Sequence, residues 1–167
     1  MTHINHFRNA DELIEHLRVV LPDVDLLMVQ NYLGFLSVAV VAVYEQAIKH
    51  IFTEFSEKKH KVFGEYARSN FRRINGKIGI DTLKNDYVKK FGEKYFKKFN
   101  ALLKQESDKL LLEQRRDLVN SYKNIITWRN EYAHASRFPT NATFSEVISA
   151  YEDGKIVIEC LSKAMHR

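Results

Sequence analysis

The sequence predicts an all-α protein, a single-domain bundle of four to six helices. Turn-forming residues are scarce, since only 6 of the 167 residues are Gly and 2 are Pro, and a fold of many short strands needs more of them. Apolar residues recur three and four positions apart in almost every segment, which is the spacing of one helix face. With 45% hydrophobic and 28% charged residues, the chain can bury a core. These observations favour one helical domain over residues 1–167.

The first two predicted helices differ in how much of their surface is apolar. Residues 1–22 are predicted to form an N-terminal helical extension, whose helix starts near Asn9 and ends before Pro22. A second helix over 24–56 is apolar nearly all round at its centre, so we expect it in the middle of the bundle, with a bend at Gly34. Its apolar part is also a candidate membrane span, but polar residues interrupt 26–43, so we expect a buried core helix and no membrane association.

The rest of the chain divides into further predicted helices. Residues 58–73 and 81–91 are each predicted to be helical, with Asp81 as a candidate cap after the break at 75–79. Residues 93–134 contain no Gly or Pro and are predicted to form one long helix, or two helices joined near 106–109. Thr143 and Glu146 have the capping-box spacing and are predicted to open the last helix.

Several classes of chemistry are excluded by the residues present. Cys160 is the single cysteine, which rules out an internal disulfide and a cysteine-based zinc site. We expect it to be buried, in a protein of the reducing cytoplasm. The seven histidines lie singly, without a second ligand one helical turn away, so no metal site is expected. Residues 75–79 lack the Gly-Lys-Ser/Thr end of a phosphate loop, and we expect no cofactor.

Positive charge is concentrated in residues 58–104. This segment has 14 Lys and Arg against 4 Asp and Glu, whereas the whole chain has a net charge of only +5. Such a field attracts polyanions, of which nucleic acid is the commonest, although the same lysines are also consistent with a solvated, solubilising surface. Four aromatic residues recur at every fourth position, which indicates a core stripe rather than a base-stacking platform. They are Tyr87, Phe91, Tyr95 and Phe99.

One cluster of residues has the chemistry to act on RNA. Asn130 and His134 are four residues apart at the end of a predicted helix, so they share a face and the amide can orient the imidazole. Arg129 lies about 140° round the helix from His134, but its side chain is long enough to reach the same groove. A guanidinium binds phosphate, and an imidazole exchanges protons near neutral pH. This pair suffices to deprotonate a ribose 2′-OH and stabilise the charge that develops at phosphorus. Spacing alone also permits a surface ion pair for Arg129 and a capping role for His134.

The sequence Arg129-Asn130-x3-His134 resembles the signature of HEPN domains, and in particular the RiboL-PSP-like HEPN subgroup. Residues 43–48 are similar to the early core helix of that subgroup, and residues 88–92 to its Phe-Gly step. The resemblance implies a helical bundle with metal-independent endoribonuclease activity. It also implies a homodimer in which two Arg–His motifs share one cleft. Many such proteins are toxins or abortive-infection effectors in bacterial defence, so an antitoxin or sensor protein is a further implied partner.

By the same resemblance, roles are carried over to individual residues. Arg129 would bind and polarise the scissile phosphate, His134 would act as general base or acid, and Asn130 would hold the histidine or the phosphate. Glu45, on the second helix, is a candidate supporting residue. Two further cations are candidate RNA-binding residues, Lys123 and Arg137.

Some features leave other functions open. Certain HEPN toxins carry a tyrosine two residues after the histidine, where a partner enzyme modifies it, but this position is Ser136 here. Regulation by that route is therefore not expected. The alternative function is a non-catalytic helical module that binds RNA or a protein, because a fold does not fix an activity. A nucleotide-sensing domain that grips a phosphate with Arg129 is a third reading.

Overall fold

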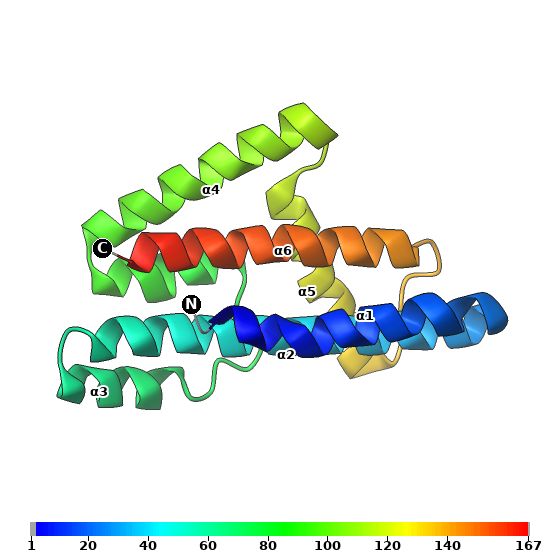
Figure 1. Ribbon diagram of the computed structural model, residues 1–167, viewed down its shortest axis with the longest axis horizontal. Helices are drawn as coiled ribbons and strands as arrows, with labels where there is room; N and C mark the ends of the chain where they lie inside the picture. The colour runs from blue at the N-terminus through cyan, green and yellow to red at the C-terminus, as the bar shows by residue number, and fades with distance from the viewer. Residues whose placement is uncertain (1–2, 167) are drawn as a thin grey trace.

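The computed structural model describes residues 3–166, and over this range the chain contains helices and loops but no strand (Figure 1). The prediction of an all-α bundle is confirmed. Six α-helices follow one another as α1 (Arg8–Val20), α2 (Leu26–Glu57), α3 (Lys61–Phe71), α4 (Glu93–Gln114), α5 (Leu118–Ala135) and α6 (Phe144–Met165). Four shorter 3-10 or π-helical segments are η1 (His3–Phe7), η2 (Leu21–Asp23), η3 (Thr82–Tyr87) and η4 (Val88–Phe91).

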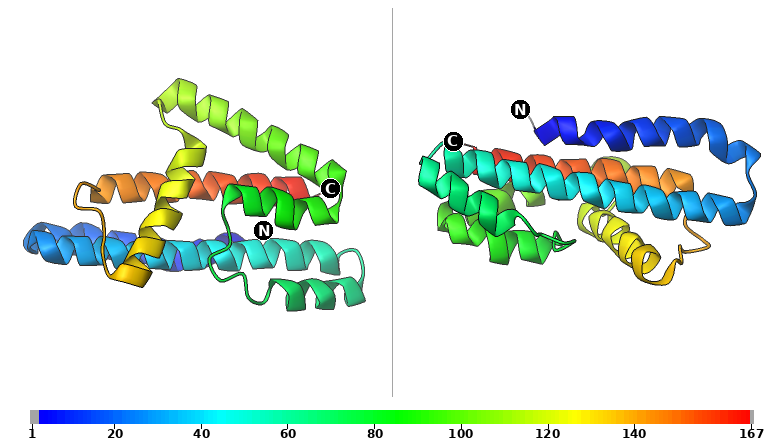
Figure 2. Two further views of the ribbon diagram at one scale, coloured as in Figure 1. Left: turned by 180° about the vertical axis from the view of Figure 1, so that it is seen from behind. Right: turned by 90° about the horizontal axis from the view of Figure 1, so that it is seen from below.

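Helix α2 is the centre of the bundle. It contacts α1, α3, α5 and α6, which surround it in the views of Figure 2. Its side chains Tyr44, Ile48 and Phe52 are completely shielded from solvent. Within residues 3–166, α2 is also the helix whose length and apolar composition would suit a membrane span. From Leu33 to Phe55 the buried side chains of α2 belong to the core, as the sequence predicted, whereas Leu26, Leu27 and Phe35 are exposed.

Gly34 sets the distance between α2 and α5. α2 continues as one α-helix through this residue. A Cβ atom on Gly34 would lie 2.2 Å from the ring of Tyr132, so glycine is what allows the two helices to cross so closely. Phe35 adds an edge-to-face contact with Tyr132, with 5.3 Å between ring centroids. The C-terminal half of α5 is thereby fixed on α2.

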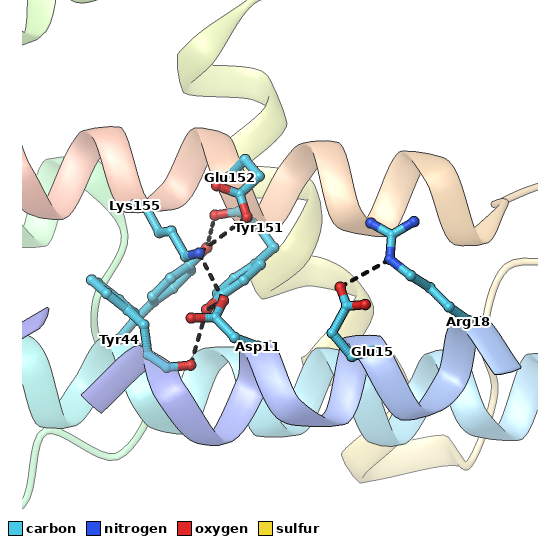
Figure 3. Close-up of polar contacts among 8 residues, drawn as sticks. Asp11, Glu15, Arg18, Tyr44, Tyr151, Glu152 and Lys155 are labelled. Carbon is cyan, nitrogen blue, oxygen red and sulfur yellow. Dashed lines mark hydrogen bonds and ion pairs between the residues drawn. The ribbon is translucent and has the colours of Figure 1, made fainter. Parts of the chain in front are cut away.

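Helix α1 packs against α2 and is tied to α6 by polar contacts (Figure 3). Asp11 accepts hydrogen bonds from Tyr151 Oη at 2.7 Å and from Lys155 Nζ at 2.8 Å. Tyr44 Oη donates to the backbone carbonyl of Tyr151 at 2.6 Å. Ile14 belongs to the same core as these rings. The segment 8–20 thus shares the core of the bundle.

The long stretch 93–134 is divided into two helices, but not where the sequence indicated. α4 runs straight through 106–109, and the break falls at Arg115, which has a left-handed backbone with φ of 54°. Asp117 then caps α5 by accepting a hydrogen bond from the Asn120 backbone N–H at 3.0 Å. The predicted joint at 106–109 is wrong because the left-handed backbone of Arg115 ends α4 and the Asp117 carboxylate starts α5, without a Gly or Pro at either position.

Residues 81–91 are less regular than predicted. They form η3 and η4 in place of one α-helix, and the Asp81 side chain makes no capping hydrogen bond. The aromatic stripe nevertheless faces the core, as predicted. Phe91 stacks on Phe52 at 5.2 Å between centroids, and Tyr95 meets Phe55 edge to face at 5.0 Å. The capping box of Thr143 and Glu146 is also confirmed.

Candidate functional site

The Arg129-Asn130-x3-His134 motif occupies the last two turns of α5. The helix ends at Ser136, whose left-handed backbone N–H donates to the carbonyl of Tyr132 at 2.9 Å. Beyond this turn the chain folds back, and Phe138 packs on Trp128 at 5.8 Å between ring centroids. Because Tyr132 also packs on Gly34, the motif lies on a well-anchored helix end.

The Arg129 guanidinium lies against the backbone of Gly76. A Cβ atom on Gly76 would be only 2.9 Å from Arg129 Nη1, so no larger residue fits there without moving the arginine. Gly76 also has a φ of 77°, which favours glycine. Arg129 Nη1 donates a hydrogen bond to Asn130 Oδ1 at 2.8 Å. The amide therefore holds the arginine, and not the histidine that the sequence offered as one of its two partners.

Glu45 meets the motif through the same glycine. Its Oε1 atom accepts a hydrogen bond from the Gly76 backbone N–H at 2.7 Å, and this contact is half-buried. The carboxylate thus fixes the backbone against which the Arg129 guanidinium rests. The arrangement fits a supporting role for Glu45, exerted on Arg129 through the loop.

Two tyrosines hold the next residues of this loop, which we define as residues 72–79. Tyr87 Oη donates to the carbonyl of Lys77 at 2.9 Å, and Tyr122 Oη donates to the carbonyl of Ile78 at 2.8 Å. Burial raises the pKa of the Tyr122 hydroxyl, and the negative charge of Glu45 raises it further, so this side chain stays a donor. In Figure 2 the loop runs beside α5 in both views. The surface beside Arg129 is therefore built from fixed backbone.

The 72–79 loop also carries positive charge. Arg72, Arg73 and Lys77 are all exposed, and none makes an ion pair within the part of the chain that the structure describes. These three cations lie within six residues of one another in the sequence, and Arg129 lies against Gly76 of the same loop. This is part of the basic segment found in the sequence, and its position next to the motif suits a phosphate-bearing ligand.

His134 is held quite differently from Arg129. Its side chain is exposed, and among residues 3–166 no side chain forms a hydrogen bond or ion pair with it. It shares one face of α5 with Asn130 and Lys123. Asn130 is four residues before His134, and Lys123 is seven residues before Asn130, which are about one and two helical turns. Lys123 is exposed on that face, and Arg137 is exposed just beyond the helix end. Contacts thus link Arg129 to Asn130 and to the Gly76 backbone that Glu45 holds, whereas His134, Lys123 and Arg137 make no side-chain hydrogen bond or ion pair within residues 3–166.

Outside this site, the expected chemistry of Cys160 is borne out. The thiol is buried, and burial raises its pKa to about 12, so it is a poor nucleophile. Among residues 3–166, no group of His, Cys, Asp and Glu is arranged to hold a metal ion.

Three histidines that the sequence separated do come together. His6 and His50 rings lie 5.5 Å apart, and His3 Nε2 lies 3.4 Å from Glu159 Oε2. Burial is the main reason why the pKa values of His3 and His6 are lowered. In the sequence these histidines lie singly, and only the packing of η1 on α2 reveals the cluster.

Helix α5 therefore ends in the Arg-Asn-x3-His sequence that resembles the HEPN signature. Compared with known protein families, the chain matches RiboL-PSP-HEPN over residues 5–167. This match covers nearly the whole sequence, so the protein belongs to the RiboL-PSP-HEPN family. Neither the curated proteins nor the solved structures contain a detectable match to it.

Sequence reasoning missed the 72–79 loop as a functional element. Its Asn75-Gly76 pair was recognised only as a break between helices, although both residues adopt positive φ angles of 50° and 77°. The signals that were available are this dipeptide and the adjoining Arg72-Arg73 pair. Nothing in the sequence indicated that the turn would rest on Arg129, because the two are more than fifty residues apart.

Proposed function

We propose that this protein is a metal-independent HEPN endoribonuclease in which Arg129 and His134 carry the reaction. The observation that supports this most directly is the pairing of a fixed guanidinium with an unengaged, exposed imidazole at one helix end, in a chain of the RiboL-PSP-HEPN family. The cations of the 72–79 loop add a field that attracts an RNA backbone.

In the proposed reaction, His134 takes the proton from a ribose 2′-OH. The 2′ oxygen then forms a bond to the adjacent phosphorus while the bond from phosphorus to the 5′ oxygen breaks, which leaves a cyclic phosphate. Arg129 binds the non-bridging oxygens and stabilises the charge that develops on them. Asn130 keeps the guanidinium in place, and the leaving 5′ oxygen takes a proton from a second imidazole or from water.

A homodimer supplies that second imidazole. One chain presents a single His134, whereas the reaction uses both a base and an acid. If two copies associate about a two-fold axis, the exposed faces of their α5 ends meet and each contributes an Arg–His pair. We therefore propose a composite site at a homodimer interface.

The biological role that fits this activity is that of a cytoplasmic toxin or abortive-infection effector. An RNA-cleaving protein in the cytoplasm needs restraint, so an antitoxin or sensor protein is a proposed partner. The buried, unreactive Cys160 is compatible with a reducing compartment.

The test is cleavage of a fluorescently labelled RNA by the purified protein in the presence of EDTA. We expect His134→Ala to lower the rate about 10²- to 10⁴-fold and Arg129→Ala to lower it about 10²- to 10³-fold. The matched controls are His16→Ala and Arg18→Ala, which remove exposed residues of the same types from α1. They should cleave like the wild type.

Two results would contradict the proposal. Cleavage that is lost in EDTA and restored by a divalent cation removes the metal-independent mechanism. Cleavage that persists in both motif variants removes the assignment of the site. RNA binding that is unaffected by His134→Ala, without any cleavage by the wild type, would instead establish the alternative of a non-catalytic RNA-binding module, which the basic segment 58–104 also supports.

A further inference from the structure

A groove of about 480 Å³ lies beside the motif, between α5 and the segment that follows the 72–79 loop. Its two walls come from different elements, since η3 and the residues before it form one wall and α5 forms the other. The side chains that matter for binding are Lys84, Thr82 and Ile80 on the first wall, and Lys123, Ile126 and Thr127 on the second.

The α5 wall of the groove lies on the same face of the helix as Asn130 and His134. Lys123 is seven residues before Asn130, which is about 10 Å along the helix axis and on the same face. At the other wall, the bond from Tyr122 Oη to the Ile78 carbonyl ties the groove to the loop that holds Arg129. A ligand with its reacting phosphate at Arg129 can therefore continue into the groove.

The chemistry of the groove suits a sugar–phosphate backbone. Lys84 and Lys123 make no ion pair within residues 3–166, so both ammonium groups are available to phosphates. Thr82 and Thr127 add hydroxyls, and the isoleucines supply an apolar floor. The one carboxylate in the lining is Asp81, and Tyr122 is the one aromatic ring, whose side chain is fully buried. Without an exposed ring to stack on, bases would contribute little, and binding would tolerate any sequence.

We propose that this groove binds single-stranded RNA on one side of the scissile phosphate. The inference rests on the proposed ribonuclease function and specifies how its substrate lies. A flexible single strand can follow a groove between one helix and one short segment, whereas a rigid duplex would meet it only with an edge. The groove thus selects unpaired RNA without reading its sequence.

The test measures binding separately from cleavage, with a fully 2′-O-methylated, single-stranded oligonucleotide that has no 2′-OH to react. We expect the double variant Lys84→Gln/Lys123→Gln to weaken binding at least about 10-fold in fluorescence anisotropy. The slope of log Kd against log salt should fall by about 1.4, because two phosphate contacts are lost. Thr127→Met removes a hydroxyl and narrows the groove without changing charge or adding an aromatic ring for bases to stack on, and should also weaken binding several-fold.

The matched control is Lys61→Gln/Lys94→Gln, which removes the same charge from exposed positions of α3 and α4. Equal weakening by both double variants, with no effect of Thr127→Met, would show that only overall charge matters and would overturn the groove. A duplex of the same length that binds as tightly as the single strand would also overturn it. If the groove variants lose binding but the wild type cuts no RNA, the RNA-binding groove is supported and the ribonuclease function is contradicted. If the wild type cuts RNA and the groove variants bind and cut normally, the ribonuclease function is supported and the groove is contradicted.

Discussion

The two ends of the motif on α5 contrast in how the chain holds them. Arg129 rests on Gly76, bonds to Asn130 and is backed by Glu45 through the loop backbone. His134, little more than one helical turn further on, is exposed and has no side-chain partner within residues 3–166. One half of the proposed site is preorganised by the single chain, and the other half is open.

This difference indicates how each of the two side chains reaches the position that it needs for the reaction. A group that stabilises developing charge works best when its position is fixed in advance, because no reorganisation is then needed during the reaction. A group that moves protons must reach the substrate oxygen, and its orientation can be set by the substrate or by a second subunit. The following predictions test whether the fixed half depends on the 72–79 loop and whether the open half is independent of the fold.

Among the variants that leave Arg129 and His134 themselves unchanged, the largest effect is expected from Gly76→Ala. The added methyl group would lie 2.9 Å from Arg129 Nη1, which is the flexible end of a side chain, so the arginine moves and the fold is retained. We expect RNA cleavage to fall about 10- to 100-fold, because a displacement of this size at a positioning group disturbs the reacting geometry. The positive φ of 77° adds about 1 kcal/mol of destabilisation. Single-turnover cleavage and urea unfolding measure the two effects.

Gly92→Ala is the matched control for that variant. Gly92 also has a positive φ, of 124°, but the nearest atom to an added methyl group is Tyr95 Cδ2 at 4.0 Å, so the variant introduces backbone strain without touching Arg129 and should cleave RNA nearly as well as the wild type. If both alanine variants lose activity to the same extent, the contact between residue 76 and Arg129 is not the cause. The conclusion that the 72–79 loop positions Arg129 would then be wrong.

A smaller effect is expected at Glu45. Glu45→Ala removes the acceptor for the Gly76 N–H and leaves that donor half-buried, so the loop loosens and cleavage falls about 10-fold. Glu45→Gln keeps an oxygen acceptor and should retain most of the activity. A positioning role lowers kcat with little change in KM, which steady-state kinetics resolves. If Gln is as damaging as Ala, the charge itself acts on the reaction and Glu45 is more than a positioning residue.

The sequence predicted much of this molecule, and the exceptions have physical causes. Helix class, the central position of α2 and the burial of Cys160 follow from local periodicity and composition. The predicted position of the α4–α5 break was wrong because no Gly or Pro marks the actual break at Arg115, where Asp117 starts α5 by a single capping hydrogen bond. The 72–79 loop was missed because its meaning depends on a contact between residues distant in the chain.

The buried histidines His3 and His6 should make the stability of the fold modestly dependent on pH, whereas the exposed His16 should not. Burial lowers the pKa values of His3 and His6 from the ordinary value of 6.5. The unfolded chain then binds more protons than the folded one, so the free energy of unfolding should decrease as the pH falls below about 6.5. Glu54 and Glu146, whose pKa values are lowered from 4.5, act only at lower pH. Urea unfolding between pH 7 and pH 5 should show the loss, and His6→Gln should reduce it, whereas His16→Gln should not.

The smallest effect is expected from His134→Ala on the fold. An exposed side chain without a partner contributes little, so the free energy of unfolding should change by less than about 0.5 kcal/mol. Arg129→Ala removes a side chain that packs on Gly76 and bonds to Asn130, and should cost about 1 kcal/mol. Urea unfolding of the two variants gives the difference directly, at a protein concentration low enough to keep any dimer dissociated. Equal losses in the free energy of unfolding would mean that the His134 imidazole is anchored as firmly as the Arg129 guanidinium. The contrast between a fixed and an open half of the site would then be wrong.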